Sequence, residues 1–297
     1  ADELKLRIAS ATKVPITGLP ISTFHALALR IVRSIGGAID VPSDFEIWTK
    51  DFERVNIIRQ LQKPVQQAGF YKDVEKEDRS AKAALAYIDV VREELLDPED
   101  ASIRAAELNS KAKIAHCEVY AAYEEYLNKE KKIDFPRMAQ LACKALAKNV
   151  QTGSSYAENC KHILIDEFQD INLAQKTLVD AFFKAGAQLW AVGDDCQAIY
   201  GWRGSNLRYM LDFEKEYPGA QVHSLKQNYR SGKHILKLAQ NLSEHFFEAY
   251  KKDLTPTREE NGKVYVDQVW DDEEEADAIV DEITLRLDDG VPLSEIA

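Results

Sequence analysis

The sequence has few cysteines, no long apolar run and no excess of positive charge. Its scattered cysteines form no CxxC pair, which argues against a disulfide framework or a zinc site and fits a reducing, cytoplasmic compartment: Cys117, Cys143, Cys160 and Cys196. No stretch approaches the ~20 consecutive apolar residues of a transmembrane helix, and the first residues do not have the pattern of a signal peptide. The formal net charge of −12 excludes nucleic-acid binding through a generally basic surface, so any such binding requires a local site.

A glycine-rich phosphate-binding loop of the GxxxxGK[ST] type is also missing from the 297 residues. The nearest match, SGKH at residues 231–234, lacks the upstream glycine. The composition is otherwise that of a globular protein with a real core, with 45% hydrophobic and 30% charged residues. The length is sufficient for two modest domains or for one domain with a large insertion.

The first half of the sequence is typical of α-helices. In STFHALALRIVRS the apolar residues recur at helical spacing, Ser22 or Thr23 is placed to cap the helix, and Gly36 follows its end. Phe24 begins the apolar stripe and is expected to face the core. The pattern remains helical to about residue 155, as in AKAALAYIDVVREELL, and predicts an all-helical unit.

Residues 162–192 have the pattern of a strand, a helix and a second, parallel strand. HILI and QLWAV are short apolar runs without alternation, as expected for strands buried on both faces of a parallel sheet. The apolar residues of INLAQKTLVDAFFKAG, between them, lie on one helical face. Further helices are predicted over 204–219, 231–247 and 271–287, and further strands over 221–225 and 263–270. The fold class is therefore α/β, with a parallel sheet interrupted by a large helical insertion.

Polar side chains follow both strands. Asp166 and Glu167 come directly after the first, and the loop after the second contains Gly193, Asp194 and Gln197. Because ligands bind at the carboxyl ends of parallel strands, these side chains are expected to meet at one edge. One carboxylate would hold Mg²⁺, and its neighbour would orient and deprotonate a water that attacks a phosphate. A solvated strand-to-helix turn is the alternative for the first pair taken alone.

The second loop continues into aromatic residues. Tyr200 and Trp202 flank a glycine, and Arg203 follows, a combination that provides stacking surfaces for unpaired bases. The alternative is that Trp202 anchors the loop to the core. In NYRS, Tyr229 would stack on a purine and Arg230 would reach a transferring phosphate, or the segment is merely a capped helix start.

The segments ILIDEFQD, VGDDCQAIYGWRGS and LKQNYRS, in this order and spacing, resemble the motifs of UvrD/Rep-type DNA helicases, a group of the first helicase superfamily. ISTFHALALRIVR and IDFPRM resemble that family too, and the likeness covers the whole chain. It implies a RecA-like (P-loop NTPase) parallel sheet with a large all-helical insertion and the start of a second RecA-like domain. The first RecA-like domain would comprise residues 1–33 and 156–225, the insertion 34–155 and the second domain 226–297.

The resemblance also implies roles for matching positions. Asp166 would bind the Mg²⁺ of Mg-ATP, Glu167 would be the general base, and Gln197 would sense the γ-phosphate. Arg230 would stabilise charge on that phosphate, and Tyr229 would stack on the adenine. The DNA contacts would be Thr23, His25, Phe135, Tyr200, Trp202 and Arg203. Of these, Thr23 and His25 would touch DNA phosphates from a helix amino-terminus.

The resemblance implies a fragment of an ATP-dependent 3′–5′ DNA helicase that acts on single-stranded DNA and on junctions of single- and double-stranded DNA. Both ends read as interrupted elements, a helix at the start and a strand at PLSEIA. The phosphate loop and the later motifs are therefore expected to be missing, and the fragment to be ATPase-deficient. The alternatives are a non-catalytic DNA-binding or interaction module and a subunit of a RecB/AddA-like helicase–nuclease. A metal nuclease using Asp166, Glu167 and Asp170 would leave the aromatic loop without a role.

Overall fold

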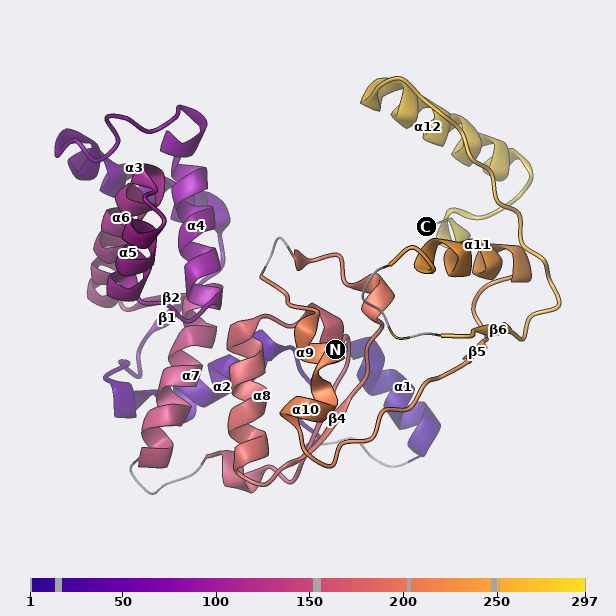
Figure 1. Ribbon diagram of the computed structural model, residues 1–297, viewed down its shortest axis with the longest axis horizontal. Coiled ribbons are helices and arrows are strands. Elements are labelled where there is room, and N and C mark those ends of the chain that lie inside the picture. Colours follow the sequence, from indigo (N-terminus) through magenta and orange to yellow (C-terminus); the bar gives the residue numbers. More distant parts are fainter. Residues whose placement is uncertain are drawn as a thin grey trace. The chain divides into compact units, whose positions relative to one another are not determined.

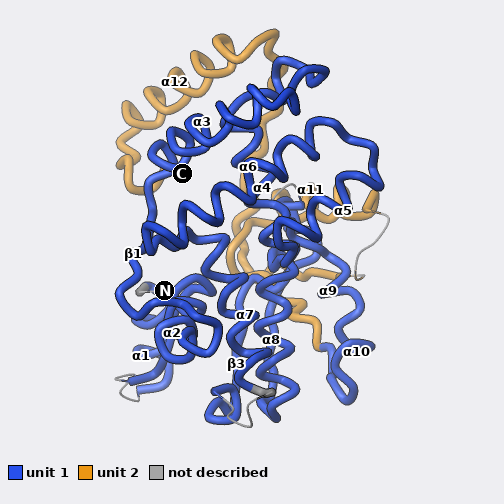
Figure 2. Tube along the Cα trace, turned by 90° about the vertical axis from the view of Figure 1, so that its left-hand side faces the viewer, with its two compact units in different colours: residues 1–222 blue, residues 223–297 orange. Residues whose placement is uncertain are grey.

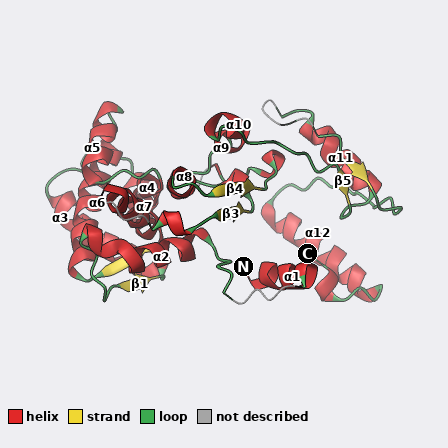
Figure 3. Cartoon of the chain, turned by 90° about the horizontal axis from the view of Figure 1, so that it is seen from below, coloured by secondary structure: helices red, strands yellow, loops and turns green. Residues whose placement is uncertain are grey.

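The computed structural model describes residues 2–13, 18–151, 156–201, 204–246, 250 and 252–296. The chain forms two compact units, residues 1–222 and 223–297, which Figure 2 colours separately. Most of the regular structure is helical, and the strands of the described residues form short parallel pairs (Figure 3). The helices of the described ranges are all too short or too polar to cross a membrane.

The first unit begins with α1 (Asp2–Thr12) and α2 (Phe24–Ile35) (Figure 1). The Thr23 side chain caps α2 by accepting a hydrogen bond from the Ala26 N–H at 3.3 Å. The apolar side of α2 is buried, and Phe24 packs against the core as predicted. The helix ends at Gly36, which leads into a 3₁₀ turn over Gly36–Ile39, so the predicted cap and end are both confirmed.

The predicted all-helical segment contains α3 (Asp51–Gln67), α4 (Ala81–Glu93), α5 (Pro98–Glu107), α6 (Lys111–Lys129) and α7 (Phe135–Gln151). Side chains accepting N–H bonds cap three of them: Ser80, Asp97 and Ser110. The segment is not purely helical, because β1 (Glu46–Trp48) and β2 (Lys132–Asp134) pair in parallel. Three-residue strands are too short to produce a recognisable sequence pattern.

A buried network of charges joins these helices to β2. The fully buried Asp134 carboxylate accepts hydrogen bonds from Arg92 Nη1 (3.0 and 2.9 Å), the Tyr123 hydroxyl (2.8 Å) and the Arg137 N–H (3.1 Å), and Arg54 Nη2 lies 3.1 Å away. Burial acts to raise the pKa of the Asp134 carboxyl, but Arg92, Arg54 and the hydrogen bonds outweigh it and hold the pKa below its ordinary value. Asp134 thereby fixes the start of α7, since the Arg137 N–H belongs to that helix.

The predicted strand–helix–strand unit is confirmed. β3 (His162–Ile165) and β4 (Gln188–Ala191) pair in parallel, and α8 (Leu173–Lys184) connects them. Asn172 and Gln175 form a reciprocal capping box at the start of α8. The helix is followed by Gly186 at φ +94°, a left-handed conformation that favours glycine. The buried face of α8 consists of Ala174, Lys176, Leu178, Val179 and Phe182.

The prediction that both strands are buried on both faces is wrong. Leu164 and Trp190, which are register partners, are 77% and 64% exposed. Ile163 and Ile165, on either side of Leu164, instead pack against buried hydrophobic residues of the core. Successive side chains of a strand point to opposite faces, so one face of this pair packs on the core and the other is open to solvent.

After β4 the chain forms a 3₁₀ turn over Asp195–Gln197 and two one-turn helices, α9 (Arg208–Leu211) and α10 (Phe213–Glu216). The single helix predicted over 204–219 is therefore wrong. Buried Lys176 of α8 donates to Glu216 (3.1 Å) and lies over the Tyr217 ring, so the end of α10 is held against α8. Residues 221–225 form no strand, contrary to prediction.

In the second unit, β5 (Gln227–Asn228) pairs in parallel with β6 (Thr255–Pro256). The predicted helices are confirmed as α11 (Lys233–Ser243) and α12 (Asp272–Asp288). The alternating segment 263–270 is not a strand, because alternation alone forms no strand without a partner to pair with. The predicted strand start at the last residues is a 3₁₀ turn, Leu293–Glu295.

Candidate functional site

The candidate site begins where β3 ends. Asp166 and Glu167 follow Ile165, and both are exposed. Glu167 has φ +54°, a left-handed backbone conformation that is uncommon for residues with a side chain. Two hydrogen bonds enforce this turn: Phe168 N–H donates to the Val192 carbonyl (2.9 Å), and Val192 N–H donates to the Ile165 carbonyl (2.8 Å). The strained turn is thus clamped to the end of β4.

Side-chain hydrogen bonds connect the two strand ends. Gln169 Nε2 donates to Glu167 Oε2 at 2.8 Å, and Gln169 Oε1 accepts from the Asp194 N–H at 3.0 Å. The Asp194 carboxylate in turn accepts from Gln197 Nε2 at 2.7 Å. Glu167 and Gln197 therefore lie at the same edge, at the two ends of one hydrogen-bonded chain, as the sequence predicts.

The loop after β4 passes so close to Gln169 that position 193 requires glycine. A Cβ atom at position 193 would lie 2.7 Å from Gln169 Oε1 and 3.2 Å from the Gln169 backbone nitrogen. Sequence reasoning pointed to Gly193 without giving it a role, and it missed Gln169 altogether. A single glutamine inside an acidic run has no distinguishing pattern.

The donor set at this edge fits Mg²⁺. Asp170 follows Gln169, and its Oδ1 atom is buried without a hydrogen-bond partner among the described residues. Burial and the nearby Glu167 charge raise the pKa of the Asp170 carboxyl, although a hydrogen bond from Gln169 partly offsets this. A run of carboxylates with an unpartnered buried oxygen supplies the hard oxygen ligands that Mg²⁺ prefers. The group Asp194, Asp195 and Cys196 also has clustered ligand atoms, but a thiol does not suit that ion.

Two of the predicted DNA-binding residues lie together although they are distant in sequence. The His25 ring of α2 meets the Phe135 ring of α7 edge-on, with centroids 5.2 Å apart. Phe135 is 39% exposed, so part of its ring is available for stacking. Desolvation lowers the pKa of His25, so at neutral pH the imidazole offers a hydrogen bond and not a positive charge. Thr23 is exposed beside them, with its hydroxyl engaged as the cap of α2.

The remaining predicted residues are placed differently. Tyr200 lies in the loop after β4 and is 39% exposed. Trp202 and Arg203 lie outside the described residues, so neither the stacking interpretation nor the core-anchor alternative is tested. In the second unit, Asn228 Oδ1 accepts from the Arg230 N–H (3.1 Å) and holds a turn that leaves the Tyr229 and Arg230 side chains exposed.

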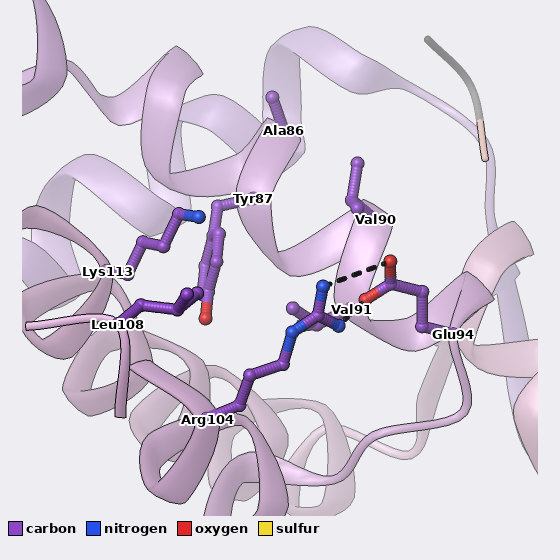
Figure 4. A pocket seen from close by; sticks show the side chains of 8 residues that line it. All are labelled: Ala86, Tyr87, Val90, Val91, Glu94, Arg104, Leu108 and Lys113. Atoms are coloured by element: carbon purple, nitrogen blue, oxygen red, sulfur yellow. Dashed lines mark hydrogen bonds and ion pairs between the residues drawn. The ribbon is translucent and has the colours of Figure 1, made fainter. Parts of the chain in front are cut away.

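A pocket in the helical segment lies apart from this edge. Arg104 of α5 pairs with Glu94 beside the Tyr87 ring, as Figure 4 shows, so these two charges neutralise each other. The lining residues are Ala86, Tyr87, Val90, Val91, Glu94, Arg104, Leu108 and Lys113.

Comparison with known proteins identifies the family. A family model described as the UvrD/REP helicase N-terminal domain matches residues 1–218. The chain belongs to the UvrD/REP helicase family. A second model, the UvrD-like helicase C-terminal domain, matches residues 223–297, so the two models meet where the two compact units meet. The family predicted from the motifs is therefore confirmed, and membership implies a RecA-like α/β fold.

Several similar proteins are named ATP-dependent DNA helicase PcrA. The one from Staphylococcus epidermidis is 30% identical over 303 residues, which cover 100% of this chain and 39% of that protein. The one from Leuconostoc citreum is 32% identical over 264 residues, covering 89% of this chain and 33% of that protein. A Staphylococcus aureus relative is 28% identical over the same coverage as the first, 100% and 39%. This UvrD/REP chain thus spans about 39% of the length of the first of these relatives.

Proposed function

We propose that this chain is part of an ATP-dependent DNA helicase that moves 3′ to 5′ along single-stranded DNA and acts at junctions with double-stranded DNA. The observation that carries the proposal is the hydrogen-bonded chain from Glu167 through Gln169 and Asp194 to Gln197. It joins a carboxylate edge suited to phosphate hydrolysis with a loop that leads to Tyr200. Family membership and the names of the relatives support the same activity.

The proposed chemistry assigns roles to carboxylate, amide, aromatic and guanidinium side chains. Asp166 would provide a carboxylate ligand for the Mg²⁺ of Mg-ATP, which would supply positive charge against the phosphates. Glu167 orients the attacking water and accepts its proton, while Gln197 contacts the γ-phosphate. Tyr229 stacks on the adenine, and Arg230 stabilises the charge that develops on the transferred phosphate.

The proposed DNA site lies on the aromatic and helix-terminal residues. Thr23 and His25 contact phosphates, whereas bases stack on Phe135, Tyr200 and Trp202 next to Arg203. Stacking and local contacts fit a chain whose net charge of −12 provides no general attraction to DNA. In domain terms we propose residues 1–33 and 156–225 as the first RecA-like domain, 34–155 as its helical insertion and 226–297 as the beginning of the second.

The DNA site is testable with the chain itself. Fluorescence anisotropy with a labelled oligo(dT) is expected to show binding that weakens as salt increases. Phe135→Ala is expected to lower the affinity roughly 5- to 160-fold, because loss of stacking on one base costs ~1–3 kcal/mol. The control is Phe52→Ala, since Phe52 is 68% exposed on α3 and has no proposed role. Absence of binding at low salt, or equal effects of the two variants, would overturn the proposed DNA site.

We further propose that this chain alone hydrolyses ATP negligibly. Its 297 residues lack the lysine and backbone donors of a GxxxxGK[ST] loop, and the loss of one such electrostatic contact commonly costs 10²–10³-fold in rate. A steady-state ATPase assay with saturating oligo(dT) tests this. Robust turnover that disappears in Glu167→Gln would contradict the proposal.

A further inference from the structure

Gln169 occupies the junction between the two strand ends. It is 2% exposed and lies in the 3₁₀ turn Phe168–Asp170. Its Nε2 donates to Glu167 Oε2 (2.8 Å) and to Asp170 Oδ2 (3.3 Å), and its Oε1 accepts from the Asp194 N–H (3.0 Å). The nitrogen of this carboxamide therefore binds residues that follow β3, and its oxygen binds a residue that follows β4.

The geometry makes the carboxamide a rigid link. Its nitrogen and oxygen belong to one planar group, so Nε2 cannot turn away from Glu167 without also displacing Oε1 from the Asp194 N–H. The backbone of Gly193 approaches so closely that a Cβ there would lie 2.7 Å from Oε1. Alternative positions for the carboxamide are therefore limited on the side of the loop.

From Asp194 the link continues along the loop. The Asp194 carboxylate accepts from the Cys196 N–H (3.1 Å) and from Gln197 Nε2 (2.7 Å). A shift of the Asp194 backbone thus changes the position of Gln197. The same shift propagates towards Tyr200, three residues further along.

We propose that Gln169 is a positioning residue that couples the orientation of the Glu167 carboxylate to the loop 193–197. The significance of the coupling rests on the proposed function, in which Glu167 is the base and Gln197 contacts the γ-phosphate. When ligands reorient Glu167, Gln169 transmits the change to the segment that leads to the DNA-stacking residues. The coupling itself depends only on the hydrogen bonds and is measurable without nucleotide or DNA.

The test is hydrogen exchange at the Asp194 amide, followed by NMR in the whole chain. Gln169→Met preserves the length and volume of the side chain but removes both of its hydrogen-bonding ends. Gln169→Glu retains an acceptor for the Asp194 N–H but places a carboxylate against Glu167. The double variant Glu167→Gln with Gln169→Glu reverses donor and acceptor, so that the new glutamine at 167 donates to the new carboxylate at 169.

We expect Gln169→Met to accelerate exchange at Asp194 roughly tenfold, which corresponds to ~1.4 kcal/mol and lies in the range of one hydrogen bond. Gln169→Glu is expected to accelerate it as well, through repulsion between the carboxylates. The double variant should recover protection severalfold relative to Gln169→Glu, although incompletely, because Asp170 still faces the new carboxylate.

Two results would overturn the proposal: an unchanged Asp194 amide in Gln169→Met, or a double variant that exchanges as fast as Gln169→Glu. The amides of Ile88 and Val91 in α4 serve as internal references, since a general loss of stability would accelerate them equally. Failure of the proposed DNA site would appear in the oligo(dT) assay and leave the exchange pattern intact, so the two failures are distinguishable.

Discussion

Replacing Asp134 by asparagine tests how strongly the buried charge network stabilises the helical segment that carries Phe135. The Asp134 carboxylate is 0% exposed and faces Arg92, also 0% exposed, as well as Arg54. Asparagine is nearly isosteric and retains a carbonyl oxygen that can cap the Arg137 N–H. The substitution therefore removes the negative charge with little change of shape.

The magnitude follows from the loss of one member of a buried ion network. Two buried arginines would lose their shared counter-charge, and removing one partner of a buried pair typically destabilises a protein by ~3–5 kcal/mol. A unit of this size loses roughly 2–4 °C of melting temperature per kcal/mol, so Asp134→Asn should lower the melting temperature by roughly 6–20 °C. A total stability in the upper part of the usual range of ~5–15 kcal/mol leaves the variant folded at low temperature.

The assays are thermal and urea unfolding, each followed by tryptophan fluorescence and circular dichroism. The matched control is Asp44→Asn, because Asp44 pairs with Lys131 at the surface and its side chain is 64% exposed. Such a surface pair is screened by solvent and is expected to contribute little to stability. If the free energies of unfolding of the two variants differ by less than about 1 kcal/mol, the claim that the network is a major source of stability is wrong.

Two further predictions concern other parts of the first unit. His116 is buried, which lowers the pKa of its imidazole to about 4. On acidification the folded chain therefore protonates His116 at a lower pH than the unfolded chain does. Stability should fall by up to roughly 3 kcal/mol as the pH drops from about 6.5 to 4, and His116→Gln should lose this part of the pH dependence of urea unfolding. Gly193→Ala should cost ~1–3 kcal/mol through overpacking against Gln169, whereas Gly37→Ala, where a Cβ meets nothing within 4 Å, should be close to neutral in thermal unfolding.

The sequence predicts best those elements whose pattern is local. The spacing of apolar residues and the cap at Thr23 gave α2, and the same reasoning gave the order β3–α8–β4. Burial of the strands was predicted wrongly, because an apolar run does not tell whether both faces of a sheet are covered, as Leu164 shows. The strand over 263–270 failed for a related reason: pairing depends on a partner that local alternation does not reveal.

The candidate site likewise contains residues that a local pattern predicts and contacts that depend on tertiary packing. Asp166, Glu167 and Gln197 were predicted from the ends of two strands, and the structure brings Glu167 and Gln197 to one edge. The role of Gln169 was not predictable, because it depends on the distance from its carboxamide to a backbone N–H 25 residues away. The contact of His25 with Phe135 likewise arises from the packing of α2 on α7.

The left-handed backbone at Glu167 has a consequence for how this site tolerates mutation. Such a conformation costs roughly 1–2 kcal/mol for residues other than glycine. A glycine at 167 would relieve that cost, so Glu167→Gly should raise the free energy of unfolding of the chain while removing the proposed base. Thermal stability and the proposed role of Glu167 are therefore opposed at this one position, and a library screened for heat resistance alone would tend to discard the carboxylate.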